Sequence, residues 1–280
     1  MPFPHSAGRA FLHAISAIAF VAAGGALDCA QAQSRLQAEY SITMAHITVG
    51  KGVWVTEIGP DQYTATASGS ASGILSVLVS GEGVISTQGA FKDGRLLPAV
   101  FTSKMDSSDD KTDLRMRFEN GNVVELAAEA PSDSEPRVPV TEAHRQGVLD
   151  PLSALLIPVG GTGEVISVEA CQRTLPVFDG RRRYDLKLAF KRADKVKADK
   201  GYQGGAVVCS LAFQPIAGHR PTSALVKYLS QGRDIELWLA PIAGTRILAP
   251  FRLSITNLIG NIVINAGKFE TVAQASPKTP

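Results

Sequence analysis

The alternation of apolar and polar side chains is the feature that most limits how this chain can fold. From Leu36 to Met44, apolar residues occupy every second position, with polar residues between them. In a β-strand this pattern places the two kinds of side chain on opposite faces, and a polar face indicates an antiparallel sheet with one solvated side. The pattern predicts further strands at 52–58, 62–71, 83–92, 95–105, 112–119, 122–130, 164–171, 182–191, 206–214, 234–240, 246–256 and 261–270.

Three dipeptides between these runs have the composition of tight hairpin turns. They are Asp93-Gly94, Asn120-Gly121 and Asp179-Gly180. Such pairs adopt the positive backbone angles that two-residue hairpins require. With 45% hydrophobic residues the chain can bury a core, which excludes a disordered protein. We therefore expect an all-β, mainly antiparallel protein with a large curved sheet or barrel-like fold and one or two short helices.

The helices are expected at two places, and one segment interrupts the strand pattern. Asp150 as N-cap and Pro151 at the first helical position predict a short helix that runs to about Ile157. A second helix is predicted over 222–230 by apolar residues at helical spacing. The polar, proline-bearing segment 131–146 is a loop or a seam between two halves. We expect one β-rich domain over 33–272, with two halves that meet at 131–146 as the alternative, and a disordered tail over 273–280.

The first thirty-two residues are typical of a secretory signal peptide. A weakly basic start precedes an apolar run from Phe11 to Leu27, and Ala30-Gln31-Ala32 offers small residues for cleavage after Ala32. The alternative is a membrane anchor, but the run is shorter than the ~20 residues that a spanning helix needs. Lipid attachment at Cys29 is disfavoured by the preceding Asp28. No later window resembles a spanning helix, so the mature chain is predicted to be periplasmic.

Removal of this leader leaves two cysteines, Cys171 and Cys209. In an oxidising compartment an even count indicates one disulfide, with two buried free thiols as the alternative. If the strands at 164–171, 182–191 and 206–214 were consecutive neighbours, the outer two would lie about 9 to 10 Å apart, beyond disulfide reach. We therefore prefer Cys171 in a bend before a short strand at 174–178, which would pair with the next strand across Asp179-Gly180.

The sequence gives no local support for catalysis, a metal or a cofactor. His46, His144 and His219 lie far apart and form no paired metal-binding spacing. The nucleophile-elbow, phosphate-loop and dinucleotide-binding motifs are absent from the sequence. We predict no catalytic residues, no metal site and no cofactor. A catalytic site assembled from distant loops stays open, since such sites are recognised by geometry.

Charge is unevenly distributed along the chain. The formal net charge of +2 does not favour nucleic acid as a partner. Residues 181–200 nevertheless hold nine Lys/Arg and three Asp, giving +6, whereas 106–135 hold nine Asp/Glu and three Lys/Arg, giving −6. The segment 191–200 is read first as a solvated hairpin tip. The alternative hypothesis is that Lys195, Lys197 and Lys200 contact an anionic envelope component such as phospholipid head groups.

Several short segments resemble an exported bacterial family catalogued as domain of unknown function 3108. They are Thr48-Val49-Gly50, Asp150-Pro151-Leu152, the run 177–185, Leu237-Trp238-Leu239 and Pro250-Phe251-Arg252. The resemblance covers roughly residues 36–271 and consists of turn and strand signatures. It implies a β-rich periplasmic protein and no established catalytic residues.

The functional expectation follows from the curved sheet. Such a sheet can enclose a cavity, so we expect a non-enzymatic envelope protein that binds or escorts an apolar or amphipathic ligand, for example a lipid. Trp54, Tyr63 and Trp238 are candidate lining residues, although large aromatic side chains also serve as core. A structural partner in envelope assembly, or an envelope hydrolase with a site from distant loops, is the alternative. The protein partners of such a role are unknown.

Overall fold

The computed structural model describes residues 34–71, 81–107, 111–128, 135–231, 234–256 and 261–273. All of them belong to one compact unit, Ala32–Pro280. The expected signal peptide, and the expected tail beyond Ala273, lie outside the described residues. Strands dominate, which confirms the predicted fold class.

Fifteen strands form one sheet. In chain order they are β1 (Ser34–Met44), β2 (Ile47–Ile58), β3 (Gln62–Ala71), β4 (Gly81–Lys92), β5 (Arg95–Ser107), β6 (Lys111–Glu119), β7 (Asn122–Ala128), β8 (Ile157–Pro158), β9 (Arg173–Phe178), β10 (Arg183–Lys197), β11 (Lys200–Gly201), β12 (Gln203–Ala217), β13 (Ile235–Pro241), β14 (Ile247–Ile255) and β15 (Ile262–Ala273). The order across the sheet is β7-β6-β5-β4-β3-β2-β1-β15-β14-β13-β12-β10-β9. Pairing is antiparallel except between β11 and β15.

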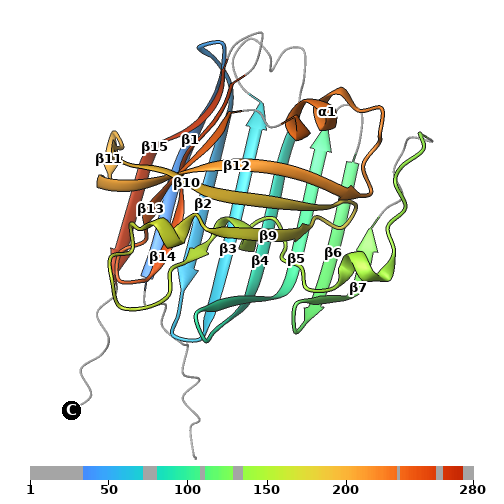
Figure 1. The fold of residues 1–280 in the computed structure, drawn as a ribbon, viewed down its shortest axis with the longest axis horizontal. Coiled ribbons are helices and arrows are strands. Elements are labelled where there is room, and N and C mark those ends of the chain that lie inside the picture. The colour runs from blue at the N-terminus through green and yellow to red at the C-terminus, as the bar shows by residue number, and fades with distance from the viewer. Residues whose placement is uncertain are drawn as a thin grey trace, which may run out of the picture. The chain divides into compact units, whose positions relative to one another are not determined.

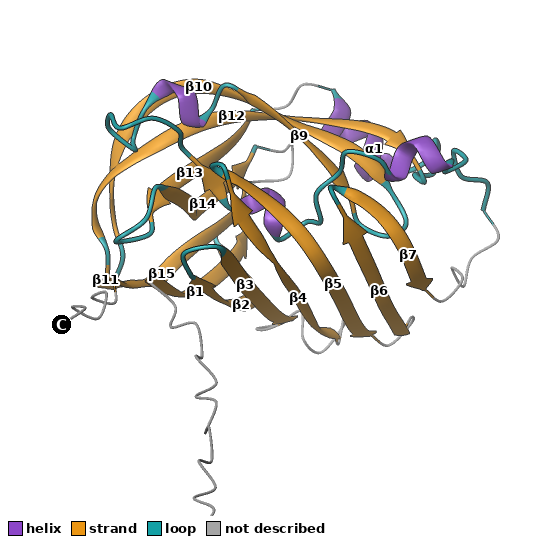
Figure 2. Cartoon of the chain, turned by 90° about the horizontal axis from the view of Figure 1, so that it is seen from below, coloured by secondary structure: helices purple, strands orange, loops and turns teal. Residues whose placement is uncertain are grey.

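The sheet curls back over itself. Figure 1 shows β9, β10 and β12 running across the face of β2 to β6, and Figure 2 shows β10 and β12 arching over these strands. Register shifts interrupt several strand pairs, for example at Glu39/Tyr40 in β1 and at Trp238/Leu239 in β13. Such bulges bend a strand and increase its twist. The described part of the sheet ends at β7 on one side and β9 on the other without pairing them, so the curl is barrel-like but not closed.

The hairpin turns follow the predicted chemistry, with one addition. Asp93-Gly94 and Asn120-Gly121 have positive φ at both residues, and Asp179-Gly180 connects β9 to β10 with positive φ at Gly180. The turn between β1 and β2 was not predicted. Ala45 and His46 also have positive φ there, although neither residue type marks a turn. This turn is where the first of the three histidines lies.

The helical predictions were right at one place and partly right at the other. Helix α1 (Ala224–Ser230) lies within the predicted range, and the hydroxyl of its N-cap Ser223 accepts a hydrogen bond from the Val226 N–H. The short helix expected over 150–157 is reduced to a 3-10 helix at Ser153–Leu155, which follows a turn and precedes the short strand β8. Asp150 caps this turn as predicted, because its carboxylate accepts the N–H groups of Leu152 and Ser153.

The strand predicted at 164–171 is absent. Its place is taken by turns and a 3-10 helix at Val168–Ala170, and Cys171 follows that helix. The Arg246 guanidinium holds the preceding loop, donating to the carbonyl oxygens of Val159, Gly160 and Gly163 at 2.9 to 3.0 Å. Because Arg246 lies more than 80 residues further along the chain, the alternation of apolar and polar residues at 164–171 could not indicate this contact.

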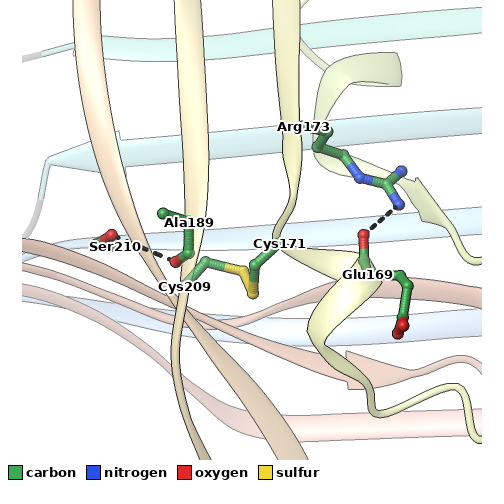
Figure 3. The surroundings of a disulfide bond; sticks show 6 residues. All are labelled: Glu169, Cys171, Arg173, Ala189, Cys209 and Ser210. Carbon is green, nitrogen blue, oxygen red and sulfur yellow. Dashed lines mark hydrogen bonds between the residues drawn. A yellow bond between two sulfur atoms is a disulfide. The ribbon is translucent and has the colours of Figure 1, made fainter.

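The predicted disulfide joins Cys171 to Cys209 with a Cα–Cα distance of 5.4 Å. Both cysteines are fully buried. Figure 3 shows Cys171 entering from the bend beside Glu169 and Arg173, whose guanidinium donates to the Glu169 carbonyl, while Cys209 lies within β12. The preferred geometry is therefore confirmed: Cys171 precedes β9, and β9 is the hairpin partner of β10.

Two groups of buried side chains form the core. The larger one joins β1 to β7 with parts of β12 to β15 and contains Leu36, Phe101, Met116 and Phe269. The smaller one surrounds the disulfide and contains Leu175, Val177, Leu188 and Leu239. The crossing strands thus pack firmly at these places, and the space between them elsewhere is what forms the candidate site.

Candidate functional site: an apolar cavity beneath the crossing strands

A cavity of about 530 Å³ lies between β1 to β4 and the strands that cross them. Its volume falls in the range of about 300 to 1,000 Å³ that small-molecule sites occupy. The wall is overwhelmingly apolar and includes Tyr40, Trp54, Leu211, Phe213, Leu237 and Leu253. Helix α1 adds Leu225, Val226 and Leu229. Leu225 is 63% exposed, so this helix lies where the cavity meets solvent.

A row of glycines crosses the sheet beside this space. Strand register places Gly52 of β2 opposite Gly69 of β3, and Gly69 opposite Gly83 of β4. Residues paired in this way point to the same face of a sheet. The row continues into Tyr40 of β1, whose side chain lines the cavity and packs against the core. Three neighbouring strands therefore present no side chain to the interior at this level.

The glycines differ in what a side chain would meet. A Cβ atom at Gly52 would have only the Ser68 carbonyl oxygen nearby, at 3.4 Å, which is an ordinary contact. At Gly83 the space is occupied, because a Cβ would lie 2.4 Å from the Met105 Sδ. Glycine inside a strand often marks the close approach of a ligand or another backbone. Among the described residues, no side chain fills the space over Gly52.

An adjoining cavity of about 790 Å³ continues along the same inner face. The two share six lining residues: Ile42, Ala67, Ser68, Ile85, Asp179 and Arg182. Gly69 and Gly83 line the second cavity, and Gly52 lines the first. The glycine row therefore joins two spaces, and an elongated ligand could occupy both.

The polar atoms in the wall of the first cavity are few. The Tyr40 hydroxyl donates to the Pro250 carbonyl at 2.7 Å, and burial raises the pKa of Tyr40, so this phenol stays neutral. Trp54 Nε1 and His219 Nδ1 are buried and have no hydrogen-bond partner among the described residues. Buried polar atoms normally have partners. These two nitrogens add a small capacity for hydrogen bonding to a mainly apolar wall.

Among the described residues, four charged ones line the first cavity: Asp179, Arg182, Arg183 and Arg252. Arg183 donates to the Asp185 carboxylate at 2.6 Å. Arg252 lies over the Trp238 ring at 5.0 Å. Charge in this cavity is thus predominantly positive, three guanidinium groups against one carboxylate.

A buried polar cluster lies near the cavity but outside its wall. Thr87 and Ser153 donate hydroxyl hydrogen bonds to the Asp150 carboxylate, and the Tyr63 hydroxyl pairs with the Ser153 hydroxyl at 2.6 Å. Burial raises the pKa of Asp150, against the opposing effect of its hydrogen-bond donors. Asp150 and Ser153 are fully buried. The cluster fastens the segment 150–153 to β3 and β4.

The sequence-predicted aromatic residues have different positions. Trp54 is 4% exposed and lines the cavity. Tyr63 belongs to the polar cluster, and the guanidinium groups of Arg192 and Arg252 each lie over the Trp238 ring, 5.3 and 5.0 Å from its centroid. Neither Tyr63 nor Trp238 is among the residues that line the first cavity. Of the three aromatic residues, Trp54 lines the cavity, and its contact with a ligand stays a prediction.

Charged groups beside Trp238 form a compact network. Glu236 accepts hydrogen bonds from Arg192 at 2.8 and 3.1 Å and lies 2.5 Å from the Lys191 ammonium. These hydrogen bonds lower the pKa of Glu236 to about 2, and those from Arg192 have the largest effect. The network links β10 to β13 across the intervening strand β12.

The histidines and lysines singled out in the sequence are dispersed. His46 lies in the turn between β1 and β2, His144 in a 3-10 helix, and His219 in the cavity wall. The exposed Lys195 and Lys197 lie near the end of β10, and the exposed Lys200 in β11. Within the described ranges, no group of three or more His, Cys, Asp or Glu side chains is arranged to hold a metal ion. The same ranges contain no helix with the length and apolar character needed to cross a membrane.

Known proteins give one family match and distant structural similarity. The family model described as "Protein of unknown function (DUF3108)" matches residues 39–266. A crystal structure of a beta-barrel-like protein of domain of unknown function DUF1849 from Brucella abortus is 11% identical, with 87% of this chain and 100% of that chain covered, at a TM-score of 0.48. The hypothetical protein CT021 from Chlamydia trachomatis is 10% identical over 87% of this chain and 90% of that chain, with a TM-score of 0.28. No curated protein matches.

Proposed function

The chain belongs to the DUF3108 family of unknown function, and from that premise we propose that it is an exported, periplasmic binding protein. Its ligand is an apolar or amphipathic molecule held in the cavity beneath the crossing strands, and no reaction is catalysed. The observation that carries this proposal is the cavity itself: about 530 Å³, walled by aromatic and aliphatic side chains. Pockets of this size and lining bury most of a small ligand's surface.

The glycine row supports binding over simple packing. Filling an interior with side chains stabilises a fold, and glycine within a strand weakens it. A row of three paired glycines beside an apolar cavity therefore has a structural drawback that a bound ligand would offset. The two buried, unpartnered nitrogens of Trp54 and His219 suit a ligand that carries a polar group.

Export is supported by the disulfide and by the predicted signal peptide. Disulfides persist in oxidising compartments and are rare in the cytosol, and the Cys171–Cys209 bond is fully buried. Cell fractionation with N-terminal sequencing tests this part of the proposal. We expect a periplasmic chain that begins after Ala32, and an unprocessed cytoplasmic chain would refute export.

A neutral apolar fluorophore, N-phenyl-1-naphthylamine, tests the binding site. The wild-type protein should enhance its fluorescence saturably. Gly52→Leu places a side chain where only the Ser68 carbonyl oxygen is near, so it should project into the cavity and weaken binding at least about tenfold, or about 1.4 kcal/mol. Thr66→Leu is the matched control, because Thr66 is exposed and lines neither cavity. Equal affinity for the probe in Gly52→Leu and wild type would refute the site.

Native mass spectrometry after gentle purification complements this assay. A lipid-sized adduct that is present on the wild type and Thr66→Leu, and is reduced on Gly52→Leu, would identify the ligand and place it in the cavity. Release of a product from envelope extracts by purified protein would instead refute the non-enzymatic role.

A further inference from the structure

The turn between β9 and β10 lies against the inner face of the sheet, at the junction of the two cavities. Gly180 packs so tightly on β6 that a Cβ atom there would lie 2.2 Å from Leu114 Cδ1. The Asp179 carboxylate accepts the N–H groups of Arg181 and Arg182 at 2.9 and 2.6 Å. These contacts fix the backbone of the turn, and hence the position from which the Arg182 side chain extends.

The Arg182 side chain is only weakly engaged. Its Nε lies 3.9 Å from the Asp179 carboxylate, at the limit of an ion pair, and the side chain is 52% exposed. Exposed pairs of this kind contribute little. Arg183, the next residue, is held by Asp185 at 2.6 Å. Arg182 therefore keeps much of its capacity to bind another anion.

The position of Arg182 would allow it to bind an anion that extends from the cavities. The residue lines both the first and the adjoining cavity, and its side chain is half exposed, so it lies where the two cavities meet solvent. The charged lining of the first cavity is mainly cationic. The adjoining cavity also contains Lys51, Glu82, Asp106 and Arg181, so its lining is balanced.

From this arrangement we propose that the ligand is an anionic amphiphile, with an aliphatic chain in the cavities and a carboxylate or phosphate head bound by Arg182. This inference rests on the proposed function and specifies the ligand class. Guanidinium groups bind both anions through paired, charge-assisted hydrogen bonds. A fatty acid and a singly acylated phospholipid offer the same chemistry at the head, and a competition experiment distinguishes them.

Cis-parinaric acid and its methyl ester test the inference, because they share a fluorescent chain and differ in charge. Wild type should bind the acid about tenfold more tightly than the ester. Arg182→Gln should lower affinity for the acid by about the same factor and leave the ester within about twofold. Lys187→Gln is the matched control: it removes one positive charge from the same hairpin, at an exposed residue outside both cavities.

Competition against bound parinaric acid then identifies the head group. Displacement by a long-chain fatty acid or by lysophosphatidic acid, at lower concentration than by monoacylglycerol, supports the inference and shows which anion is preferred. Equal displacement by the neutral monoacylglycerol overturns it, as does equal wild-type affinity for acid and ester.

The two proposals fail in different ways. If Gly52→Leu weakens both acid and ester but Arg182→Gln changes neither, the cavity binds ligand and the anionic class is wrong. If Gly52→Leu changes neither, the cavity is not the binding site and both proposals fall. Circular dichroism and urea unfolding of each variant confirm that the fold is retained.

Discussion

Two effects act on the buried Asp150 carboxylate: the hydrogen bonds that it accepts, and its burial away from water. Replacing Asp150 should separate their contributions to stability. Its Oδ1 accepts the N–H groups of Leu152 and Ser153, each at 3.0 Å, and its Oδ2 accepts the Thr87 hydroxyl at 2.9 Å and the Ser153 hydroxyl. Asp150→Ala removes every one of these acceptors. The hydroxyls can pair with each other or with Tyr63, since Thr87 and Ser153 already lie 3.3 Å apart.

The two backbone N–H groups have no such replacement. A buried donor left without an acceptor destabilises the fold by about 1 to 3 kcal/mol, so Asp150→Ala should lower the free energy of unfolding by about 4 kcal/mol. Asp150→Asn keeps an oxygen at the Oδ1 position and should lower it by only about 1 kcal/mol. Urea unfolding followed by tryptophan fluorescence measures both, because Trp54 and Trp238 are buried. Equal losses in the two variants would refute this assignment of the backbone hydrogen bonds.

The pH dependence tests the second effect. Burial raises the pKa of Asp150 above its ordinary 3.8, so the folded protein binds more protons than the unfolded chain above that pH. Stability from this group is therefore fully present below about pH 3.8 and is lost as pH rises through the folded-state pKa. Asn does not titrate, so the advantage of wild type over Asp150→Asn should shrink from about pH 3 to about pH 8. An advantage that grows with pH would show that the hydrogen-bond donors outweigh burial.

Two further predictions concern the disulfide and the basic hairpin. Cys171→Ala with Cys209→Ala should lower the free energy of unfolding by about 4 kcal/mol, because the bridge closes a loop of sequence separation 38; reductant should lower wild-type stability in urea similarly and leave the double variant unchanged. Replacing the exposed Lys195, Lys197 and Lys200 with Gln should weaken salt-sensitive retention on anionic vesicles without affecting neutral ones. Unchanged retention would discard the hypothesis of an anionic envelope contact.

The strands could be predicted from the sequence because one face of each is buried. β3 has the predicted bounds, Gln62–Ala71, and the alternation of Tyr63 and Ala65 with polar neighbours reports its buried face directly. The prediction failed at 164–171, where the controlling contacts are the Arg246 hydrogen bonds and the disulfide. These partners lie far away in sequence, and local periodicity carries no information about them.

The candidate site was harder to predict, since it depends on register. Trp54 was singled out from its residue type, but the glycines opposite each other in β2, β3 and β4 were not. Glycine within an expected strand was the available signal. It becomes informative only when the pairing of Gly52 with Gly69 and of Gly69 with Gly83 is known. Arg182 was likewise assigned to the start of a strand, and only the crossing of β9 and β10 over β6 brings it to the cavities.

Two rows of residues paired across neighbouring strands of the sheet differ in how they fill the interior. One row runs through Leu36, Thr56, Ala65, Thr87, Phe101 and Met116, and every member is buried. The other row has glycine in its three central strands. A leucine at Gly52 adds apolar surface and improves strand propensity, so Gly52→Leu should raise the urea midpoint while it lowers probe affinity. A variant that binds weakly because it unfolds more readily would show instead that the glycine row serves the fold.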